Sequence, residues 1–403
     1  MATLAEGTST IENPLVARDT VATFNACKSL GAGIQHQNAS LEISGRTILN
    51  VPDDIINVEN SGTTLRVMTA ISSLIPHGFA VLTGDSSIRR RPMQPLLDAL
   101  NTLGSECWSA RGDGQAPIIV RGGGLRGGEV TIRGDVSSQF ISALLMASPK
   151  AKSETSIEVV ENAVSRPYVV ATLEMMALFG AKVLMDGNNF YRVPEHQNLR
   201  YARLKIPGDF SSAATVLAGA LLTGGQVSID DLDATLPQAD WSFTEFLKRM
   251  GCEAKIDNTT KTVTVGASDD LSGGTFDLSD CPDLLPVMAA LSVKAKNEVS
   301  IVGVGHARFK ETDRISILAQ ELSKMGILVR EEKDSLTIRS NRELKKCVLD
   351  SHGDHRLFMT FCIIGLASLE GLIVEGLETF DISYPNFISD IQKLGGKIEV
   401  IPN

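Results

Sequence analysis

Aromatic residues, histidines and cysteines are all scarce in this sequence. The 14 Phe, 4 Tyr and 2 Trp residues are too few to argue for a surface on which nucleic-acid bases stack. The 6 cysteines form no C-x-x-C motif, and they do not pair with the 6 histidines at the spacing of a metal site. These absences argue against a disulfide framework and a metal centre. We expect reduced thiols in a cytoplasm, most of them packing residues.

Excess positive charge and long apolar runs are also lacking. The 38 Lys and Arg residues are outnumbered by 48 Asp and Glu residues, and no tail is rich in Lys or Arg. An acidic chain repels a polyanion, so we expect no nucleic-acid partner. The longest charge-free apolar run, 357–369, is shorter than the roughly 20 residues of a membrane-spanning helix, and no signal or transit segment is recognisable. We expect a soluble, cytoplasmic protein that does not bind membranes.

An internal repeat organises the chain. A helix-like segment that ends in an apolar residue and a glycine occurs six times, at Gly31, Gly104, Gly180, Gly251, Gly326 and Gly395. The glycines are 73, 76, 71, 75 and 69 residues apart, each where the left-handed cap of a helix is expected. Each is followed by a stretch with the pattern of a strand, for example 181–184 and 397–400.

A second kind of helix alternates with the first and is apolar on all sides, as expected of helices inside a domain. The expected segments are 61–74, 137–146, 211–222, 283–293 and 354–369. The repeating unit is therefore strand, buried helix, strand, amphipathic helix and strands. Three units precede the polar stretch 194–200 and three follow Gly208. We infer an α+β protein of two similar domains, residues 1–207 and 208–403, joined near 205–208.

The same spacing leaves the first unit incomplete. Gly7, Gly78, Gly224 and Gly371 end buried helices at single or double steps of roughly 73 residues. Residues 1–6 are therefore expected to be the tail of a sixth buried helix, whose beginning is absent. Either the true start codon lies upstream of Met1 or the chain has been shortened, and a protein that truly began at Met1 would lack the start of this helix and the strand before it.

Several predicted helices begin with cations. The N-terminal end of a helix carries a partial positive charge and disfavours Arg or Lys by about 0.3 to 1 kcal/mol unless an anion is near. The segments 60–66, 310–314 and 353–356 each open a predicted helix and nevertheless carry cations, and the run 89–91 leads into a helix whose first turn would suit Pro92. Nearby glycines and hydroxyl groups could supply N–H groups for a phosphate or carboxylate.

Each of these features also has an ordinary structural explanation. Glu311 and Arg314 can form a surface pair, the serine pairs 137–138 and 211–212 can cap helices, Arg89 and Arg90 can be solvated, and His355 can be structural. Taken together, the unfavourably placed cations of an acidic chain indicate a small polyanionic substrate. Glu311 lies between Lys310 and Arg314, as expected where proton transfer accompanies anion binding.

These segments resemble the 5-enolpyruvylshikimate-3-phosphate (EPSP) synthase family over essentially the whole chain. The most specific matches are Asn-x-Gly-Thr-x-x-Arg at 60–66, Lys-Glu-x-Asp-Arg at 310–314 and Asp-His-Arg at 354–356. Further matches lie at 4–8, 91–92, 136–140, 165–168 and 208–213. The resemblance implies two inverse α/β barrel domains of the enolpyruvyl transferase type, each of three βαβαββ units, with the active site in the cleft between them.

The resemblance also implies a reaction. The enolpyruvyl group of phosphoenolpyruvate would be transferred to the 5-hydroxyl of shikimate 3-phosphate, and phosphate would leave through a tetrahedral intermediate, in the shikimate pathway to chorismate and the aromatic amino acids. Asp283 would be the general base, Lys310 would contact the attacking hydroxyl, and Glu311 would move a proton at the methylene carbon. No metal or organic cofactor is implied, and the chain would be a monomer.

The binding residues that the resemblance implies come from both halves of the chain. Shikimate 3-phosphate would contact Ser137, Ser138, Gln139, Ser165, Tyr168, Asp283, His306 and Lys310. Phosphoenolpyruvate would contact Gly62, Arg91, Gln139, Arg314 and Arg356. Asn60, Thr63, Arg66, Asp354 and His355 would support these groups.

Two other functions fit part of the pattern. UDP-N-acetylglucosamine enolpyruvyl transferase shares the fold and the donor but uses a Gly-Gly-Cys loop, whereas the stretch before Arg91 is Gly-Asp-Ser-Ser-Ile at 84–88. A non-catalytic anion-binding relative is the second alternative, because the family's Lys-Ser-x-x-x-Arg motif would precede Met1 and its absence would impair activity. Family members often carry an asparagine where His306 stands, and some carry a lysine near 382–383.

Overall fold

The fold is described from a computed structural model that covers residues 1–161, 163–266, 270–341 and 343–401. The chain divides into two compact units, Met1–Ile206 and Pro207–Asn403. Each unit is built from strands and helices that alternate along the chain, so the predicted α+β class is confirmed. The two units are described in turn.

Unit 1 contains three four-stranded sheets within the described residues, and they share one topology. Their strand orders are β12-β1-β3-β2, β4-β5-β7-β6 and β8-β9-β11-β10. In each sheet the first two strands are parallel and the other pairs are antiparallel. The strands are β1 (Thr8–Glu12), β2 (Gly33–Gln37), β3 (Ser40–Ser44), β4 (Ile56–Asn57), β5 (Phe79–Thr83), β6 (Glu106–Ser109), β7 (Ile118–Arg121), β8 (Gly128–Arg133), β9 (Thr155–Val160), β10 (Leu184–Asp186), β11 (Phe190–Val193) and β12 (Arg203–Lys205).

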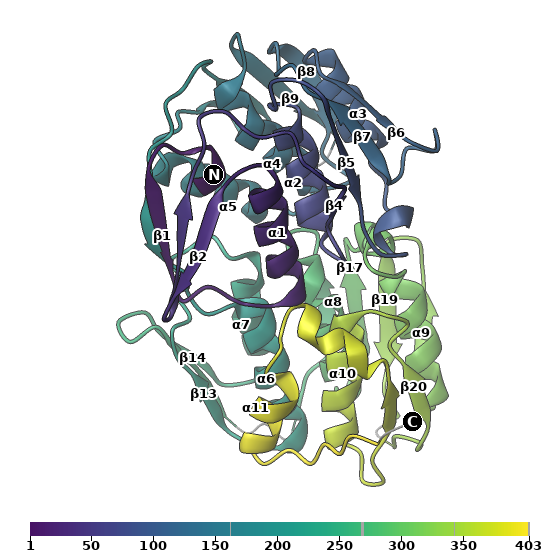
Figure 1. Cartoon of the computed structure of the whole chain (residues 1–403). Helices are drawn as coiled ribbons and strands as arrows, with labels where there is room; N and C mark the ends of the chain where they lie inside the picture. The colour runs from purple at the N-terminus through teal and green to yellow at the C-terminus, as the bar shows by residue number, and fades with distance from the viewer. Residues whose placement is uncertain (162, 267–269, 342, 402–403) are drawn as a thin grey trace. The chain divides into compact units, whose positions relative to one another are not determined.

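The helices of unit 1 follow the predicted alternation. They are α1 (Arg18–Ser29), α2 (Gly62–Ser72), α3 (Gln94–Thr102), α4 (Ser138–Ala147) and α5 (Arg166–Leu178). The apolar helices α2 and α4 pack against each other inside the unit, and α5 packs on α4 (Figure 1). This packing places the first turns of α2 and α4, with their polar residues, close to each other.

Unit 2 repeats the strand arrangement less completely. Its sheets within the described residues have the orders β13-β15-β14, β16-β17-β19-β18 and β20-β21. Only the middle one is four-stranded, and it has the parallel first pair of the sheets in unit 1. The strands are β13 (Val227–Ile229), β14 (Ala254–Asp257), β15 (Thr262–Val265), β16 (Gly274–Asp277), β17 (Val299–Val302), β18 (Leu328–Glu331), β19 (Ser335–Arg339), β20 (Val348–Asp350) and β21 (Ile373–Glu375).

Three apolar helices form the interior of unit 2. α6 (Phe210–Thr223), α8 (Leu285–Ser292) and α10 (His355–Leu366) contact one another pairwise (Figure 1). The amphipathic helices are α7 (Phe243–Arg249), α9 (Arg314–Lys324) and α11 (Phe387–Lys393). Because α6, α8 and α10 bury most of their side chains, their polar N-terminal residues are held by a close-packed core.

The helix-ending glycines confirm the predicted repeat. All six of the spaced glycines have a positive φ, from 78° at Gly180 to 98° at Gly31. This left-handed backbone is strained for other residues, which explains why glycine recurs at the same place in every repeat. The short segment before Gly7 is a 3-10 turn, η1 (Ala2–Leu4), where the tail of a helix was expected.

Other boundaries differ from the predictions. Residues 397–400 are irregular where a strand was expected, because no strand in the described ranges pairs with them; instead Gln392 Nε2 donates a hydrogen bond to Ile398 O at 2.8 Å. The strand predicted at 181–184 begins only at Leu184. Pro92 precedes α3, which begins at Gln94.

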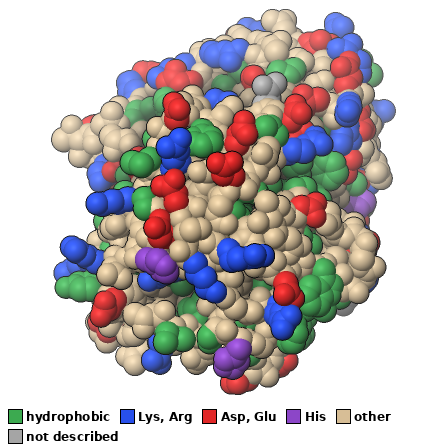
Figure 2. All heavy atoms as spheres, turned by 90° about the horizontal axis from the view of Figure 1, so that it is seen from above, with side chains coloured by type: hydrophobic (Ala, Val, Ile, Leu, Met, Phe, Trp, Pro, Cys, Tyr) green, Lys and Arg blue, Asp and Glu red, His purple; other side chains and the backbone are tan. Residues whose placement is uncertain are grey.

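No helix in the described ranges is long and apolar enough to cross a bilayer. Within the described residues none of the six cysteines forms a disulfide, and four of them are buried, in agreement with a packing role. Figure 2 shows one face of the molecule, on which acidic and basic side chains are interspersed.

Candidate active site

Four charged side chains that are far apart in the sequence meet in unit 2. Asp283 Oδ1 lies 2.8 Å from Arg314 Nη1 and 3.3 Å from Lys310 Nζ, and Asp283 Oδ2 lies 3.3 Å from Arg356 Nη2. Asp283 belongs to the 3-10 turn η5 (Pro282–Leu284), which leads into α8. The predicted general base is therefore surrounded by three of the predicted substrate-binding cations.

Arg314 is the centre of this cluster and is almost fully buried, with 1% of its side chain exposed. Besides Asp283, its guanidinium donates to Glu311 Oε2 at 2.7 Å and from Nε to Asp354 Oδ2 at 2.7 Å. Burial alone would lower the pKa of Arg314, but the charges of Asp354, Glu311 and Asp283 raise it above its usual value. Arg314 therefore stays charged, and its guanidinium is paired with three carboxylates.

The starts of α9 and α10 explain why these residues meet. α9 begins at Arg314, after the N-cap Asp313, which accepts a hydrogen bond from Ser316 N at 3.1 Å. Asp354 caps α10 by accepting hydrogen bonds from Arg356 N at 2.9 Å and Leu357 N at 3.3 Å. The Asp354 carboxylate is thus both a helix cap and the partner of Arg314. The negative charge of each capping aspartate offsets the repulsion between the helix N-terminus and a cation. A cation can therefore occupy the first turn of each helix.

The electrostatic surroundings keep Asp283 ionised. Burial would raise the pKa of its carboxyl group, but the charges of Arg356, Lys310 and Arg314 outweigh burial and hold that pKa well below its usual value. The charge of Asp283 in turn raises the pKa of Arg356 against the effect of burial. In this state Asp283 is a weak base, because its protonation would leave three cations around a neutral group.

The two predicted site histidines are neutral at physiological pH. Burial lowers the pKa of His355 to about 4, and burial together with the charge of Lys310 lowers the pKa of His306 to about 4. Among the described residues, neither His355 Nδ1 nor His306 Nε2 has a hydrogen-bond partner. The neutral rings do not supply protons near pH 7. No group of His, Cys, Asp and Glu in the described ranges is arranged to hold a metal ion.

Asp240 is a buried carboxyl group whose charge interacts with the charged cluster, and the sequence did not predict it. Asp240, in η4 (Ala239–Ser242), is 2% exposed and accepts a hydrogen bond from Ser211 Oγ. Burial and the charge of Asp283 raise the pKa of Asp240 to about 7, against the opposing charge of Arg356. The local sequence does not predict the raised pKa of Asp240. Asp240 is 43 positions from Asp283, and their charges interact only because of the packing of unit 2.

Arg308 was also missed, although it precedes Lys310 by two positions. It lies in η6 (Gly305–Phe309), and its Nη1 atom is 2.8 Å from both Asp313 Oδ2 and Glu331 Oε1. Its Nε and Nη2 atoms donate to the carbonyl oxygens of Lys333 at 3.0 Å and Glu332 at 2.6 Å. Arg308 precedes the 310–313 loop and contacts Asp313 at the end of that loop. Its contacts with Glu332 and Lys333 therefore connect both ends of the loop to the turn between β18 and β19.

A second polar cluster lies in unit 1, at the first turns of α2 and α4. Arg66 Nη1 donates to Gln139 Oε1 at 2.8 Å, and Gln139 Nε2 donates to Thr63 Oγ1 at 2.8 Å. A Cβ atom on Gly62 would be 2.7 Å from Arg66 Nη1 and even nearer to Arg91 Nη1. Both buried guanidinium groups thus lie against the glycine, and this close approach explains why a residue without a side chain stands there.

The loop that carries Arg91 is held by Asn60. Asn60 Nδ2 donates to Asp85 Oδ2 at 2.7 Å and to Ser87 Oγ at 3.0 Å. Asp85 also accepts from Ser87 Oγ at 2.8 Å and from Ile88 N at 2.9 Å. Burial would raise the pKa of Asp85, but these hydrogen bonds lower it. Asn60 therefore fixes the loop at 85–88, which leads to Arg91 beside Gly62.

The serine pairs differ in what they do. Ser137 caps α4 and accepts from Gln139 N at 3.3 Å, while Ser138 is buried in the first turn. At 211–212 the cap is instead Asp209, which accepts from Ser211 N at 3.1 Å and Ser212 N at 2.9 Å. Ser165 and Tyr168 lie at the start of α5, which is linked to α4 by a 2.7 Å hydrogen bond between Ser142 and Thr172.

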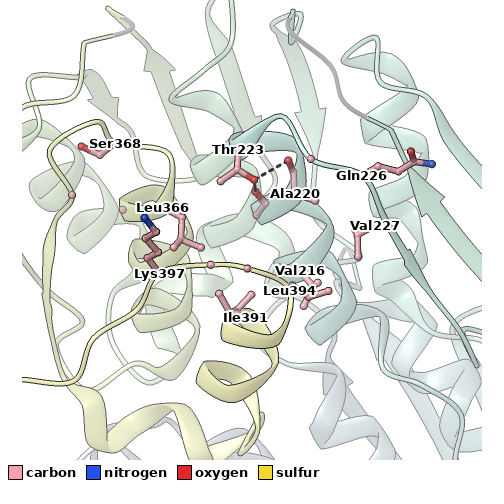
Figure 3. Close-up of a pocket in the computed structure, with 16 residues that line it drawn as sticks. Val216, Ala220, Thr223, Gln226, Val227, Leu366, Ser368, Ile391, Leu394 and Lys397 are labelled. Carbon is pink, nitrogen blue, oxygen red and sulfur yellow. Dashed lines mark hydrogen bonds between the residues drawn. The ribbon is translucent and has the colours of Figure 1, made fainter.

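Unit 2 also contains a cavity of about 470 Å³, and Figure 3 shows the residues that line it. It lies at the C-terminal ends of α6 and α10 and is lined mainly by apolar residues and glycines, among them Val216, Leu366 and Leu394. The charged cluster lies at the N-terminal end of α10, and a helix of 12 residues is about 18 Å long. The cavity therefore lies apart from the charged cluster.

Repeated βαβαββ modules in two units, with cations and carboxylates at helix N-termini, define a two-domain transferase of the enolpyruvyl transferase class. The sequence model of the family EPSP synthase (3-phosphoshikimate 1-carboxyvinyltransferase) matches residues 1–391. The chain belongs to this family.

Individual relatives agree with the family match. The chain is 41% identical to the 3-phosphoshikimate 1-carboxyvinyltransferase of Methanocaldococcus jannaschii over 401 residues, which cover 99% of this chain and 92% of that protein. It is 43% identical to the protein of the same name from Methanosarcina acetivorans over 397 residues, 98% of this chain and 91% of the relative. A solved EPSP synthase from Acinetobacter baumannii superimposes with a TM-score of 0.81 and 26% identity, covering 100% of this chain and 93% of that one. These matches favour EPSP synthase over both alternatives raised by the sequence.

Proposed function

We propose that this protein transfers the enolpyruvyl group of phosphoenolpyruvate to the 5-hydroxyl of shikimate 3-phosphate. A C–O bond forms between that hydroxyl oxygen and C2 of phosphoenolpyruvate while C3 gains a proton. Phosphate then leaves C2 and C3 loses a proton, which restores the double bond. The observation that carries this assignment within the family is the cluster of Asp283 and Glu311 around Arg314, because the reaction needs a base, an acid and cations together.

Each part of the cluster has a proposed role. Asp283 accepts the hydroxyl proton, with Lys310 beside the same oxygen, and Glu311 carries the proton to and from the methylene carbon. Phosphoenolpyruvate contacts Arg314 and Arg356 in unit 2. In unit 1 it contacts Gly62, Arg91 and Gln139, supported by Asn60, Thr63 and Arg66, and shikimate 3-phosphate contacts Ser137, Ser138, Gln139, Ser165, Tyr168 and, from unit 2, His306.

Substrate binding would also activate the two carboxylates. Without substrate, the three cations hold the pKa of Asp283 well below its usual value, which makes it a weak base. Phosphoenolpyruvate brings its own negative charges to Arg314 and Arg356, and these charges compensate the cations in place of Asp283 and Glu311. The basicity of Asp283 then rises, and Glu311 leaves its ion pair with Arg314. Proton transfer is thereby coupled to the presence of the donor substrate.

Phosphate release tests the proposal directly. The purified chain is incubated with shikimate 3-phosphate and phosphoenolpyruvate, together and singly, and we expect phosphate and an enolpyruvyl product only with both substrates. Glu311→Gln keeps the size of the side chain and a polar contact with Arg314 but cannot carry the proton, so turnover should fall by about 10²-fold or more. Phosphate release without shikimate 3-phosphate, or none with both substrates, would contradict the proposed reaction.

A further inference from the structure

We propose that Glu321 and His352 are positioning residues that fix the turn preceding α10 and thereby place Asp354 and Arg356 for phosphoenolpyruvate. The catalytic part of this proposal rests on the proposed function. Neither Glu321 nor His352 belongs to a motif that pointed to the family. Glu321 lies two turns beyond Arg314 on α9, and its carboxylate is fully buried, at 0% exposure. A buried carboxylate is stable only when its contacts are well formed, so the partners of Glu321 indicate its role.

The partners of Glu321 lie mainly on the segment that leads into α10. Its Oε2 atom accepts a hydrogen bond from Asp350 N at 3.0 Å, at the end of β20. Its Oε1 atom is 3.2 Å from His352 Nε2. The third partner, Lys324 Nζ, is 2.6 Å from Oε2 but belongs to α9 itself. Glu321 thus joins α9 to two positions of one short turn.

That turn has an unfavourable backbone. His352 has φ 51° and Gly353 has φ 80°, two consecutive left-handed residues, and this conformation is uncommon for a residue other than glycine. Asp350 stabilises it by accepting a hydrogen bond from His352 N at 2.7 Å. The contact between Glu321 and the His352 ring holds the same residue from the other side. Such strained positions persist where the surroundings over-determine them, commonly near a functional site.

The consequence for the site follows from the order of residues along the chain. The turn ends at Asp354, which binds Arg314 and caps α10, and Arg356 follows in the first turn. α9 therefore contacts this segment at two places, through Arg314 to Asp354 and through Glu321 to Asp350 and His352. Loss of the second contact lets the turn relax, which displaces Arg356 and loosens the Asp354 cap. Displacements of about 1 Å in such groups can cost about 10²-fold in rate.

Four variants separate positioning from simple stability. Glu321→Ala removes both contacts with the turn, whereas Glu321→Gln keeps an acceptor for Asp350 N. In His352→Asn, the asparagine tolerates the left-handed backbone, but its side chain is too short to reach Glu321. This variant replaces Glu321→Ala in the test if Glu321→Ala does not fold. Lys324→Ala is the matched control, because it removes a partner of the same carboxylate without touching the turn; its side chain is 39% exposed.

The kinetic readout is the apparent KM for each substrate in the phosphate-release assay. We expect the KM for phosphoenolpyruvate to rise about tenfold in Glu321→Ala and His352→Asn, and to stay within about threefold of wild type in Glu321→Gln and Lys324→Ala. The KM for shikimate 3-phosphate should change little. A fall in kcat alone, with both KM values unchanged, would indicate a smaller folded fraction and would overturn the proposal.

Hydrogen exchange gives a readout that does not depend on the reaction. The amides of Arg356 and Leu357, which donate to Asp354, should exchange about tenfold faster in Glu321→Ala and His352→Asn than in Lys324→Ala, without substrates present. Equal exchange in all variants would overturn the positioning role. If this pattern appears but the wild type releases no phosphate, the positioning role stands and the proposed function fails.

Discussion

Arg314 Nη1 and Asp283 Oδ1 are 2.8 Å apart, so a proposed substrate-binding cation and the proposed general base are direct partners. In the proposed mechanism, phosphoenolpyruvate competes with carboxylates of the protein for Arg314. The arrangement keeps a buried arginine paired before substrate arrives, since an unpaired buried charge would be strongly destabilising. It also means that the chemistry and the binding of the anion depend on the same residues.

Replacing the base should abolish most turnover without unfolding the protein. In Asp283→Asn the amide keeps the shape of the side chain but cannot accept the hydroxyl proton, and Arg314 retains Asp354 and Glu311 as partners. We expect kcat to fall by about 10²-fold or more, with the melting temperature measured in parallel. Asp280→Asn, at an exposed carboxylate three positions earlier, is the control and should behave as wild type. Turnover of Asp283→Asn within a factor of two of wild type would exclude Asp283 as the base.

The pH dependence of stability should report Asp240. Burial and the charge of Asp283 raise its pKa from 3.8 to about 7, so the folded state holds a proton that the unfolded chain releases above its ordinary pKa. The free energy of unfolding therefore decreases as the pH rises from about 4 to about 7, and the contribution is fully lost above that range.

Asp240→Asn removes this component and leaves every other titrating group in place. We expect the melting temperature of the variant, relative to wild type, to increase between pH 4 and pH 7 and to stay constant at higher pH. A difference of about 1 kcal/mol would correspond to about 2–4 °C. A difference independent of pH would show that Asp240 has an ordinary pKa. Asp280→Asn again provides the exposed control.

The repeat could be read from the sequence because its signals are local. A helix that ends in a left-handed residue favours glycine at that position, and a buried helix must be apolar on all sides. The cations at 310–314 and 354–356 were also visible, because each contradicts the local preference of a helix N-terminus. Such departures from a local rule mark functional positions well.

Other features depend on contacts that are distant in the sequence. The raised pKa of Asp240 arises from burial and from Asp283, and no pattern around residue 240 predicts either. Residues 397–400 have a strand-like sequence, but a strand also needs a hydrogen-bonded neighbour, and the described residues supply none. Glu321 could not be distinguished from an exposed helix carboxylate, because only the tertiary packing reveals its contacts with Asp350 and His352.

Gly62→Ala should weaken the proposed binding of phosphoenolpyruvate at the polar cluster of unit 1 while leaving the fold stable. The added Cβ atom would be 2.7 Å from Arg66 Nη1, so both neighbouring guanidinium groups must move. Gly62 is the first residue of α2 and does not have a positive φ, so alanine fits the backbone at this position.

We expect the KM for phosphoenolpyruvate to rise at least about tenfold in Gly62→Ala, with a nearly unchanged melting temperature. The control is Gly219→Ala within α6, where the new Cβ atom would make an ordinary 3.4 Å contact with Ile363. An unchanged KM for phosphoenolpyruvate would show that displacing Arg66 and Arg91 does not affect donor binding.

Arg308→Lys should slow catalysis by loosening the loop that carries Lys310 and Glu311. A lysine keeps the positive charge but has no planar fork, so it cannot contact Asp313, Glu331 and two carbonyl oxygens at once. We expect kcat to fall about tenfold, because Glu311 is no longer held at the position for proton transfer. Arg330→Lys on β18 is the control, since its 3.4 Å pair with Glu332 is on the surface and 66% of its side chain is exposed. Equal kcat values for the two lysine variants would show that the fork of Arg308 does not position the loop.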